Sequence, residues 1–167
     1  MKDIFEPSTK QNCDEQWMRE ALIEARKCLR SASGSTLPDD VPVGAICVYQ
    51  NRIIARAHNR RELDRNPIAH AETLCLQSAA QVLAQRHLND VTLYVTLEPC
   101  PMCAGAIWLS RVSRVVFGAW DERAGACGSL FDLPRDPRLN HRPQVLAGVM
   151  QSECEAMLNE FFALRRS

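Results

Sequence analysis

Strand-like runs alternate with helical segments from residue 43 onward, and this alternation constrains the fold more than any other feature of the sequence. The runs are short, apolar and rich in β-branched residues, and they occupy 43–49, 52–57, 91–97, 114–119 and 145–150. Between the first two runs, Gln50-Asn51 suits a tight hairpin turn. Helices are predicted at 69–85, 101–110 and 152–164. A hairpin followed by alternating helices and strands predicts an α/β fold, with a mixed sheet covered by helices on both faces.

The two ends of the chain and one irregular segment complete this outline. Apolar residues at three- and four-residue steps predict a first helix over 14–30, with Asp14 as its N-cap. The pattern Ser152-Glu-Cys-Glu155 predicts a capping box at the start of the last helix. We expect residues 1–13 to be a loose N-terminal extension. Residues 121–143 show little periodicity, which indicates a functional loop or short helices.

Length and composition fix the class of protein. The 167 residues suit a single domain over 1–167, and 46% hydrophobic with 24% charged residues excludes a disordered or fibrous chain. No apolar run reaches the roughly 18 residues of a membrane helix, and the first residues lack the apolar core of a signal peptide. We therefore expect a cytoplasmic protein with no membrane partner and with reduced cysteines. Four of its eight cysteines lie in apolar stretches and are predicted core residues: Cys28, Cys47, Cys75 and Cys154.

The charge pattern leaves room for a nucleic-acid partner without requiring one. A net charge of zero disfavours a strongly basic binder of long DNA duplexes. Residues 51–66, however, carry five arginines against Glu62 and Asp64. Arginine offers planar, bidentate donors suited to phosphate. This segment is either a basic face for a ligand or an ordinary solvated surface with scattered ion pairs.

Two short motifs carry candidate metal ligands at equivalent places in the predicted fold. His70-Ala-Glu72 opens one helix, and Pro99-Cys100-Pro-Met-Cys103 lies where a strand leads into the next helix. One imidazole and two thiolates are zinc ligands, and three protein ligands leave the open position of a catalytic site. A helix N-terminus stabilises thiolates. Zinc lowers the pKa of a bound water, and Glu72 is placed to accept the proton.

Neither motif is sufficient by itself. A lone C-x-x-C pair could be a redox pair or half of a structural zinc site, and a lone histidine before a helix is usually a capping or surface residue. The combination favours catalytic zinc for two reasons. A redox pair would leave Glu72 unexplained, and a structural site lacks an obvious fourth ligand.

His-x-Glu followed by Pro-Cys-x-x-Cys is a recognised signature of zinc deaminases that act on nucleobases. From about residue 17 to 166 the chain resembles the bacterial tRNA-specific adenosine deaminases (the TadA type) of the cytidine-deaminase-like superfamily. The segments after Ser110 argue for this tRNA branch over the free-base deaminases. The matching segments are 41–45, 58–60, 69–72, 92–100, 102–106, 110–111, 114–119, 128–130, 140–142, 153–154 and 161–162.

The resemblance implies a fold, a reaction and roles for single residues. The fold would be a three-layer α/β/α arrangement with a mixed five-stranded sheet, assembled as a homodimer. The reaction would be zinc-dependent hydrolytic deamination of the wobble adenosine to inosine in a tRNA anticodon loop. One zinc ion per chain would be held by His70, Cys100 and Cys103, with Glu72 as the proton shuttle.

The resemblance also implies substrate contacts. Asn59 matches the residue that hydrogen-bonds the flipped-out nucleoside, although it could instead end the second strand through an Asx turn. Asp121 matches an acid near the anticodon-loop sugar. Five arginines are candidate contacts to RNA phosphates: Arg60, Arg61, Arg65, Arg138 and Arg142.

Three departures from the family pattern keep alternatives open. Pro101 is frequent in cytosine- and guanine-type enzymes, so the alternative is a zinc-dependent deaminase of a free nucleobase or nucleoside. The polar loop over 31–40 is longer than usual, and Trp120 stands where a smaller or charged residue is expected. A zinc-stabilised RNA-binding module without catalysis is a third possibility, and Glu72 argues against it because such a module needs no shuttle carboxylate.

Overall fold

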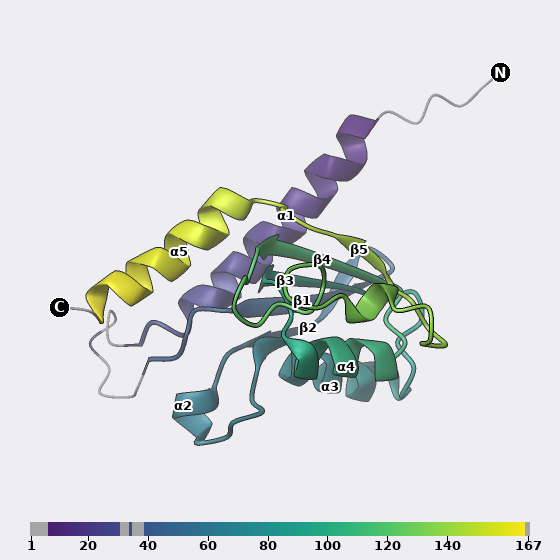
Figure 1. Cartoon of the computed structure of the whole chain (residues 1–167), viewed down its shortest axis with the longest axis horizontal. Coiled ribbons are helices and arrows are strands. Elements are labelled where there is room, and N and C mark those ends of the chain that lie inside the picture. The colour runs from purple at the N-terminus through teal and green to yellow at the C-terminus, as the bar shows by residue number, and fades with distance from the viewer. Residues whose placement is uncertain (1–6, 31–33, 35–38, 166–167) are drawn as a thin grey trace.

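The computed structural model describes residues 7–30, 34 and 39–165. Its centre is a five-stranded sheet with the strand order β2-β1-β3-β4-β5. The strands are β1 (Gly44–Tyr49), β2 (Arg52–His58), β3 (Thr92–Leu97), β4 (Arg114–Ala119) and β5 (Gln144–Leu146). The helices are α1 (Pro7–Arg26), α2 (Arg61–Asp64), α3 (Ala71–Leu83), α4 (Pro101–Leu109) and α5 (Gln151–Leu164), with a 3-10 helix, η2, at Leu133–Arg135. Helices α1 and α5 cover one face of the sheet and α3 and α4 the other (Figure 1), which confirms the predicted three-layer α/β/α fold.

The sheet is mixed, as predicted. Strand β1 pairs antiparallel with both β2 and β3, whereas β3, β4 and β5 run parallel. Gln50 and Asn51 join β1 to β2 with φ values of 48° and 58°, and two positive φ angles suit the twist of a two-residue hairpin. The parallel strands bring the carboxyl ends of β3 and β4 to one edge, and α4 starts there.

Successive side chains along each strand point to opposite faces of the sheet, so the core consists of two apolar layers, one on each face. In β1, Cys47 faces the layer shared with α3 and α4, and Ile46 faces the layer shared with α1 and α5. Phe117 and Val116 divide in the same way in β4. The four cysteines predicted to be core residues are all buried.

Two glycines let helices approach the sheet closely. A Cβ atom at Gly44 would lie 2.1 Å from the backbone oxygen of Ala21 and 2.4 Å from the backbone nitrogen of Ala25 in α1. A Cβ atom at Gly118 would lie 2.3 Å from the Sγ of Cys154 in α5. Real Cβ atoms do not come this close to such atoms, so these helix positions depend on the absence of a side chain.

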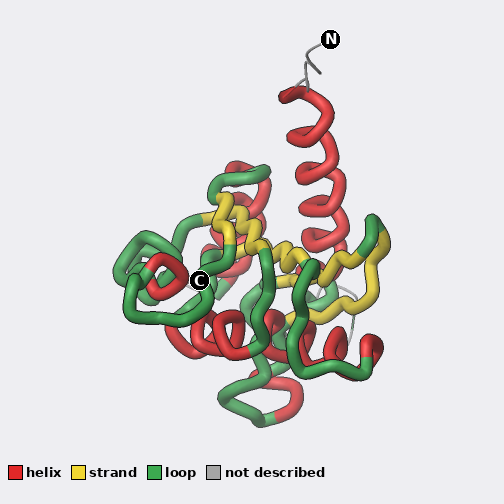
Figure 2. The backbone as a smooth tube through the Cα atoms, turned by 90° about the vertical axis from the view of Figure 1, so that its right-hand side faces the viewer, coloured by secondary structure: helices red, strands yellow, loops and turns green. Residues whose placement is uncertain are grey.

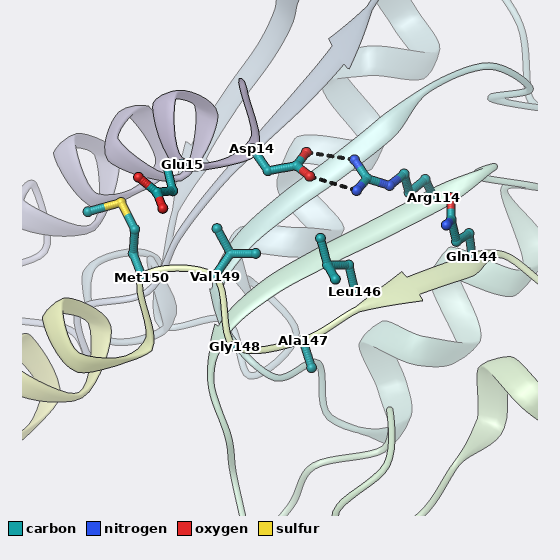
Figure 3. A pocket seen from close by; sticks show the side chains of 9 residues that line it. All are labelled: Asp14, Glu15, Arg114, Gln144, Leu146, Ala147, Gly148, Val149 and Met150. Carbon is teal, nitrogen blue, oxygen red and sulfur yellow. Dashed lines mark hydrogen bonds and ion pairs between the residues drawn. The ribbon is translucent and has the colours of Figure 1, made fainter. Parts of the chain in front are cut away.

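The start of α1 differs from the prediction. The helix begins at Pro7, a residue type suited to the first helical position, so residues 7–13 are helical and not loose; residues 1–6 lie outside the described residues. Figure 2 shows this end of α1 extending beyond the sheet. Asp14 is not a cap. It lies within α1, is buried, and accepts hydrogen bonds from the Arg114 guanidinium at 2.7 and 2.8 Å (Figure 3). The Tyr94 hydroxyl also donates to it, at 2.8 Å.

The last strand and helix also differ in detail. Strand β5 ends at Leu146 and not at residue 150, because Gly148 has a φ of 78°, outside the extended region. Helix α5 follows Met150, which is left-handed with a φ of 53°, and no side chain caps the helix, so the predicted capping box is wrong. In the irregular segment 121–143, η2 is a short helix of the kind expected. Most of the predicted 31–40 loop lies outside the described residues.

No helix among residues 7–30 and 39–165 combines the length and apolarity that crossing a membrane requires.

Candidate active site

Two neighbouring helix N-termini bring the three predicted zinc ligands together. His70 immediately precedes α3, Cys100 immediately precedes α4, and Cys103 lies in the first turn of α4. The Nδ1 atom of His70 lies 3.7 Å from the Sγ of Cys100 and 3.5 Å from the Sγ of Cys103. All three ligand atoms lie within 4.8 Å of one another.

This donor set fits a zinc ion. Tetrahedral coordination with bonds of about 2.3 Å to sulfur and about 2.05 Å to nitrogen separates ligand atoms by roughly 3.5–3.8 Å. The two nitrogen–sulfur distances, 3.7 and 3.5 Å, agree with that geometry before any rearrangement. Three nitrogen and sulfur ligands also match the pattern in which one coordination position stays open.

Hydrogen bonds around Cys100 favour the thiolate form of this side chain. The hydrogen bond with the Cys103 thiol, followed by the one with His70, lowers the pKa of Cys100 to about 4. The hydrogen bond with Cys100 in turn raises the pKa of His70. The pKa of Cys103 is raised, first by sharing its proton with Cys100 and then by burial. Cys100 is thus a thiolate at neutral pH, which is the form that binds a metal.

Glu72 lies in the first turn of α3 with only 4% of its surface exposed. Burial raises the pKa of this carboxyl to about 7, and a backbone hydrogen bond and the nearby His70 oppose the shift. Glu72 and two of the ligands, His70 and Cys100, line one cavity of about 760 Å³. The carboxyl group is therefore next to the metal-binding group and accessible from the cavity.

Asn59 and Asp121, the two predicted substrate contacts, line the same cavity. The Asn59 side chain accepts from the Ala71 N–H at 2.9 Å and donates to the Val41 carbonyl at 3.1 Å, so its partners are distant in sequence and it forms no local Asx turn through these bonds. The amide nitrogen of Asn59 has two hydrogens. One of them is used in the hydrogen bond to the Val41 carbonyl. Asp121 accepts from the N–H groups of Arg123 and Ala124 at 3.0 and 3.2 Å, which shapes its own turn.

The five candidate phosphate contacts divide into separate groups. Only Arg61 belongs to the described cavity lining. Arg60 is held by Asp64 in a two-bond ion pair at 2.7 and 2.8 Å, and Arg65 is exposed after α2. Arg138 pairs with Asp136, and Arg142 is exposed near Asn140. Asn140 is anchored by Trp108 and Arg111, at the end of α4 opposite the ligands.

Sequence reasoning missed several residues of the cavity rim. Arg123 lines the cavity and was not among the five candidates. Trp120 and Phe162 also line it, with 40% and 41% of their surfaces exposed. Trp120 is identified from the sequence only as a departure from the family pattern. Its ring makes an edge-to-face contact with the ring of Phe117, with the two centroids 4.9 Å apart. The signal for Phe162 was its place in the matching segment 161–162, although its role was not assigned.

Comparisons with known proteins agree with this geometry. A MafB19-like deaminase family profile matches residues 14–163. The chain is 48% identical to the tRNA-specific adenosine deaminase of Bacillus subtilis over 149 residues, which covers 89% of this chain and 88% of that protein.

Two solved structures bear on the choice between an RNA and a free base. One comes from work on A-to-I editing by tRNA:A34 deaminases at the wobble position of transfer RNA. It has a TM-score of 0.77 and 37% identity, and the alignment covers 85% of this chain and 98% of that one. The guanine deaminase of Nitrosomonas europaea is less similar, with a TM-score of 0.69, 26% identity and coverage of 89% and 84%. The chain therefore belongs to the tRNA-specific adenosine deaminases of the cytidine and deoxycytidylate deaminase superfamily.

Proposed function

We propose that this enzyme hydrolyses the wobble adenosine of a tRNA anticodon loop to inosine, with one zinc ion per chain. The observation that carries the proposal is the joint placement of His70, Cys100, Glu72 and Asn59 around one cavity, with Cys103 completing the ligand group. The relatives named for tRNA-specific deamination are 48% and 37% identical to this chain over the aligned residues. An identity of 26% to a guanine deaminase supports the free-base alternative less well.

His70, Cys100 and Cys103 would hold the metal. A zinc ion bound there supplies Lewis-acid chemistry, lowering the pKa of a water molecule at its open position. Cys103 is buried and Cys100 lies at the cavity surface, so the ligand group is open on the side of the substrate.

Glu72 would carry protons between water and base. Its carboxylate takes one proton from the attacking water and gives it to N1 of adenine as the water oxygen bonds to C6. The same carboxylate then moves the remaining hydroxyl proton to the amino group, the C6–N6 bond breaks, and ammonia leaves. The products, inosine and ammonia, balance adenosine plus water. A buried carboxyl beside the ligands suits this work because proton transfer needs hydrogen-bond reach.

Asn59 would orient the nucleoside. Its carbonyl oxygen is occupied by Ala71 N–H and one amide hydrogen by Val41, which fixes the side chain and leaves the second amide hydrogen for the substrate. Ala71 is the residue after His70, so this hydrogen bond also ties the position of Asn59 to the ligand segment. Asp121, which lines the same cavity, would contact the sugar.

The cavity rim offers groups suited to a single-stranded loop. Arg61 and Arg123 supply positive charge for phosphate at the rim, and we also keep Arg60, Arg65, Arg138 and Arg142 as proposed contacts. The exposed rings of Trp120 and Phe162 could stack on bases, as aromatic residues do in proteins that bind single strands.

We further propose a homodimer located in the cytoplasm. Met102 and Leu109 stand seven residues apart, on one side of α4, with 36% and 66% of their surfaces exposed, and Phe131 is 51% exposed. Large exposed apolar side chains favour an interface between protein chains. A cytoplasmic location would place the enzyme with tRNA, the substrate named for its relatives.

The decisive experiment compares substrates. Purified zinc-loaded protein is incubated with an anticodon stem-loop containing a wobble adenosine, and with free adenine, guanine and cytosine, and the products are separated by liquid chromatography and mass spectrometry. We expect inosine in the stem-loop and little change in the free bases, because a fragment forfeits remote binding energy. Turnover of a free base with an unchanged stem-loop would support the alternative function.

A further inference from the structure

We propose that Glu98 is a positioning residue: its carboxylate holds the loop 121–129, one wall of the active-site cavity, in place for substrate binding. The effect on substrate rests on the proposed function, whereas the effect on the loop does not. Glu98 lies between strand β3 and the ligand Cys100, and none of the roles derived above uses it.

The carboxylate of Glu98 is buried, with 2% of the residue exposed. Its Oε1 accepts hydrogen bonds from the backbone N–H groups of Cys127 at 2.9 Å and Ser129 at 3.0 Å. Its Oε2 accepts from the backbone N–H of Asp121 at 3.0 Å and from the Ser129 hydroxyl. Four donors, all from one loop, therefore converge on a single side chain, and hydrogen bonds to a charged acceptor are the stronger kind.

The loop is wrapped tightly around this carboxylate. A Cβ atom at Gly125 would lie 2.2 Å from the Oε2 of Glu98 and 2.5 Å from the Asp121 carbonyl oxygen. Only a residue without a side chain fits at this place. Gly125 N–H also donates to the Asp121 carbonyl at 2.7 Å, so the turn closes on itself above the carboxylate.

The same short segment fixes the loop relative to the zinc ligands. The backbone N–H of Glu98 donates to the Ala119 carbonyl at 2.8 Å, and the Pro99 carbonyl accepts from the Ala126 N–H at 2.8 Å. Cys100 follows directly. Residues 121–124 line the cavity that holds His70 and Glu72. Glu98 therefore sets the distance between one wall of the cavity and the group that performs the chemistry.

Glu98→Gln tests this arrangement without changing the size of the side chain. The Gln oxygen is best placed toward Cys127 and Ser129, where it satisfies two N–H groups. The amide nitrogen then faces Asp121 and the Ser129 hydroxyl. The hydroxyl can turn and accept, but the Asp121 N–H loses its acceptor. Loss of this hydrogen bond to a charged acceptor shifts the equilibrium between the held and the displaced loop by about tenfold or more.

Two measurements follow from this reasoning. In hydrogen exchange followed by NMR, the Asp121 amide of Glu98→Gln should lose about tenfold or more of its protection, while the Cys127 and Ser129 amides keep most of theirs. With the stem-loop as substrate, KM should rise about tenfold and kcat should change less than about threefold, with a full zinc content. Ser129→Ala, which removes only the hydroxyl donor, should raise KM less.

Glu24→Gln is the matched control. Glu24 is also a buried carboxyl, 3% exposed, but it pairs with Lys27 and Arg56 and does not line the cavity. It should lower the stability of the protein and leave KM and the Asp121 amide unchanged. A KM rise of equal size in Glu24→Gln would overturn the proposal. It would show that a general loss of stability is enough to raise KM, without any change at the loop 121–129.

The remaining outcomes are also informative. Unchanged protection of Asp121 in Glu98→Gln would show that the carboxylate does not hold the loop. Lost protection with an unchanged KM would show that the loop is not a substrate-positioning wall. If the wild-type protein produces no inosine but the exchange pattern appears, the proposed function fails and the role of Glu98 in holding the loop stands.

Discussion

The buried ion pair between Asp14 and Arg114 should be one of the main supports of helix α1. The two side chains are 6% and 16% exposed and share two hydrogen bonds, at 2.7 and 2.8 Å (Figure 3). Tyr94 gives Asp14 a third, and Asp14 in turn raises the pKa of Arg114 by hydrogen bonding to it. In Asp14→Ala the guanidinium loses its carboxylate and keeps the Tyr94 hydroxyl at 3.5 Å. Breaking a fully buried pair typically costs about 3–5 kcal/mol. Because Arg114 is only partly buried and lines a cavity of about 450 Å³, we expect the lower end of that range, about 3 kcal/mol. For a chain of this length that corresponds to a melting temperature lower by roughly 6–12 °C.

The assay is urea denaturation of the zinc-loaded protein followed by circular dichroism, for Asp14→Ala, for Arg114→Met and for the double variant. The double variant should cost less than the sum of the single ones, because it leaves no buried charge. A helix-capping Asp would cost about 0.5–2 kcal/mol and would show no coupling to Arg114. A loss below about 1 kcal/mol for Asp14→Ala, with additive effects in the double variant, would show that the ion pair does not support helix α1.

Three further predictions concern the metal, the proton shuttle and acid stability. Cys100→Ser should lose both zinc and activity, and full zinc by elemental analysis would contradict its assignment as a ligand. Glu72→Ala should keep zinc and fold but turn over about 100-fold or more slowly, and near-normal turnover would mean that another group moves the protons. Burial lowers the pKa of His58 from its ordinary 6.5 in the folded protein. As pH falls below about 6.5, the unfolded state takes up the proton first, so stability is lost. In His58→Gln the free energy of unfolding, measured by urea denaturation between pH 7 and 5.5, should fall less than in the wild type. Equal losses would argue against this role.

The sequence was a good guide wherever the signal was local. Strands and helices follow the apolar periodicity, and the grouping of the three predicted zinc ligands follows from their spacing next to two predicted helix starts. Their convergence is a consequence of topology: parallel β3 and β4 and the adjacent helices α3 and α4 bring residues 70 and 100 within 3.7 Å. A predicted α/β fold of this kind therefore already implies that the two helix starts lie close together.

Most of what the sequence does not predict depends on partners that are distant along the chain, and one error is local. Asp14 has the residue type of a cap, but its partners lie 80 and 100 residues away, so no local pattern could show that it is buried within the helix. Ser152-Glu-Cys-Glu155 matches a capping box, yet α5 begins one residue earlier, after the left-handed Met150. Glu98 stands inside a recognised segment, and its donors come from positions 23 to 31 residues further along. Such roles depend on which loop packs against which strand, and short-range patterns do not encode it.

The arginines near the cavity allow a last test of the RNA substrate. Arg61 lines the cavity, whereas Arg60 would first have to leave its two hydrogen bonds with Asp64. Each lost contact to a single-strand phosphate should make the dependence of log K on log salt shallower by about 0.7. Arg61→Ala should therefore reduce the slope more than Arg60→Ala, with kcat unchanged at saturating substrate.

Fluorescence anisotropy of a labelled stem-loop between 50 and 200 mM salt, roughly the range in which such contacts are screened, measures these slopes. Arg86→Ala is the matched control. It removes an exposed arginine that follows the C-terminus of α3, and a helix of 13 residues separates it from His70 by roughly 20 Å. The slope of Arg86→Ala should equal that of the wild type, because a change in total charge without a phosphate contact releases no counterion at the bound loop. If Arg61→Ala and Arg86→Ala both bind with the same slope as the wild type, Arg61 touches no phosphate, and its place in the cavity lining reflects an ordinary solvated surface.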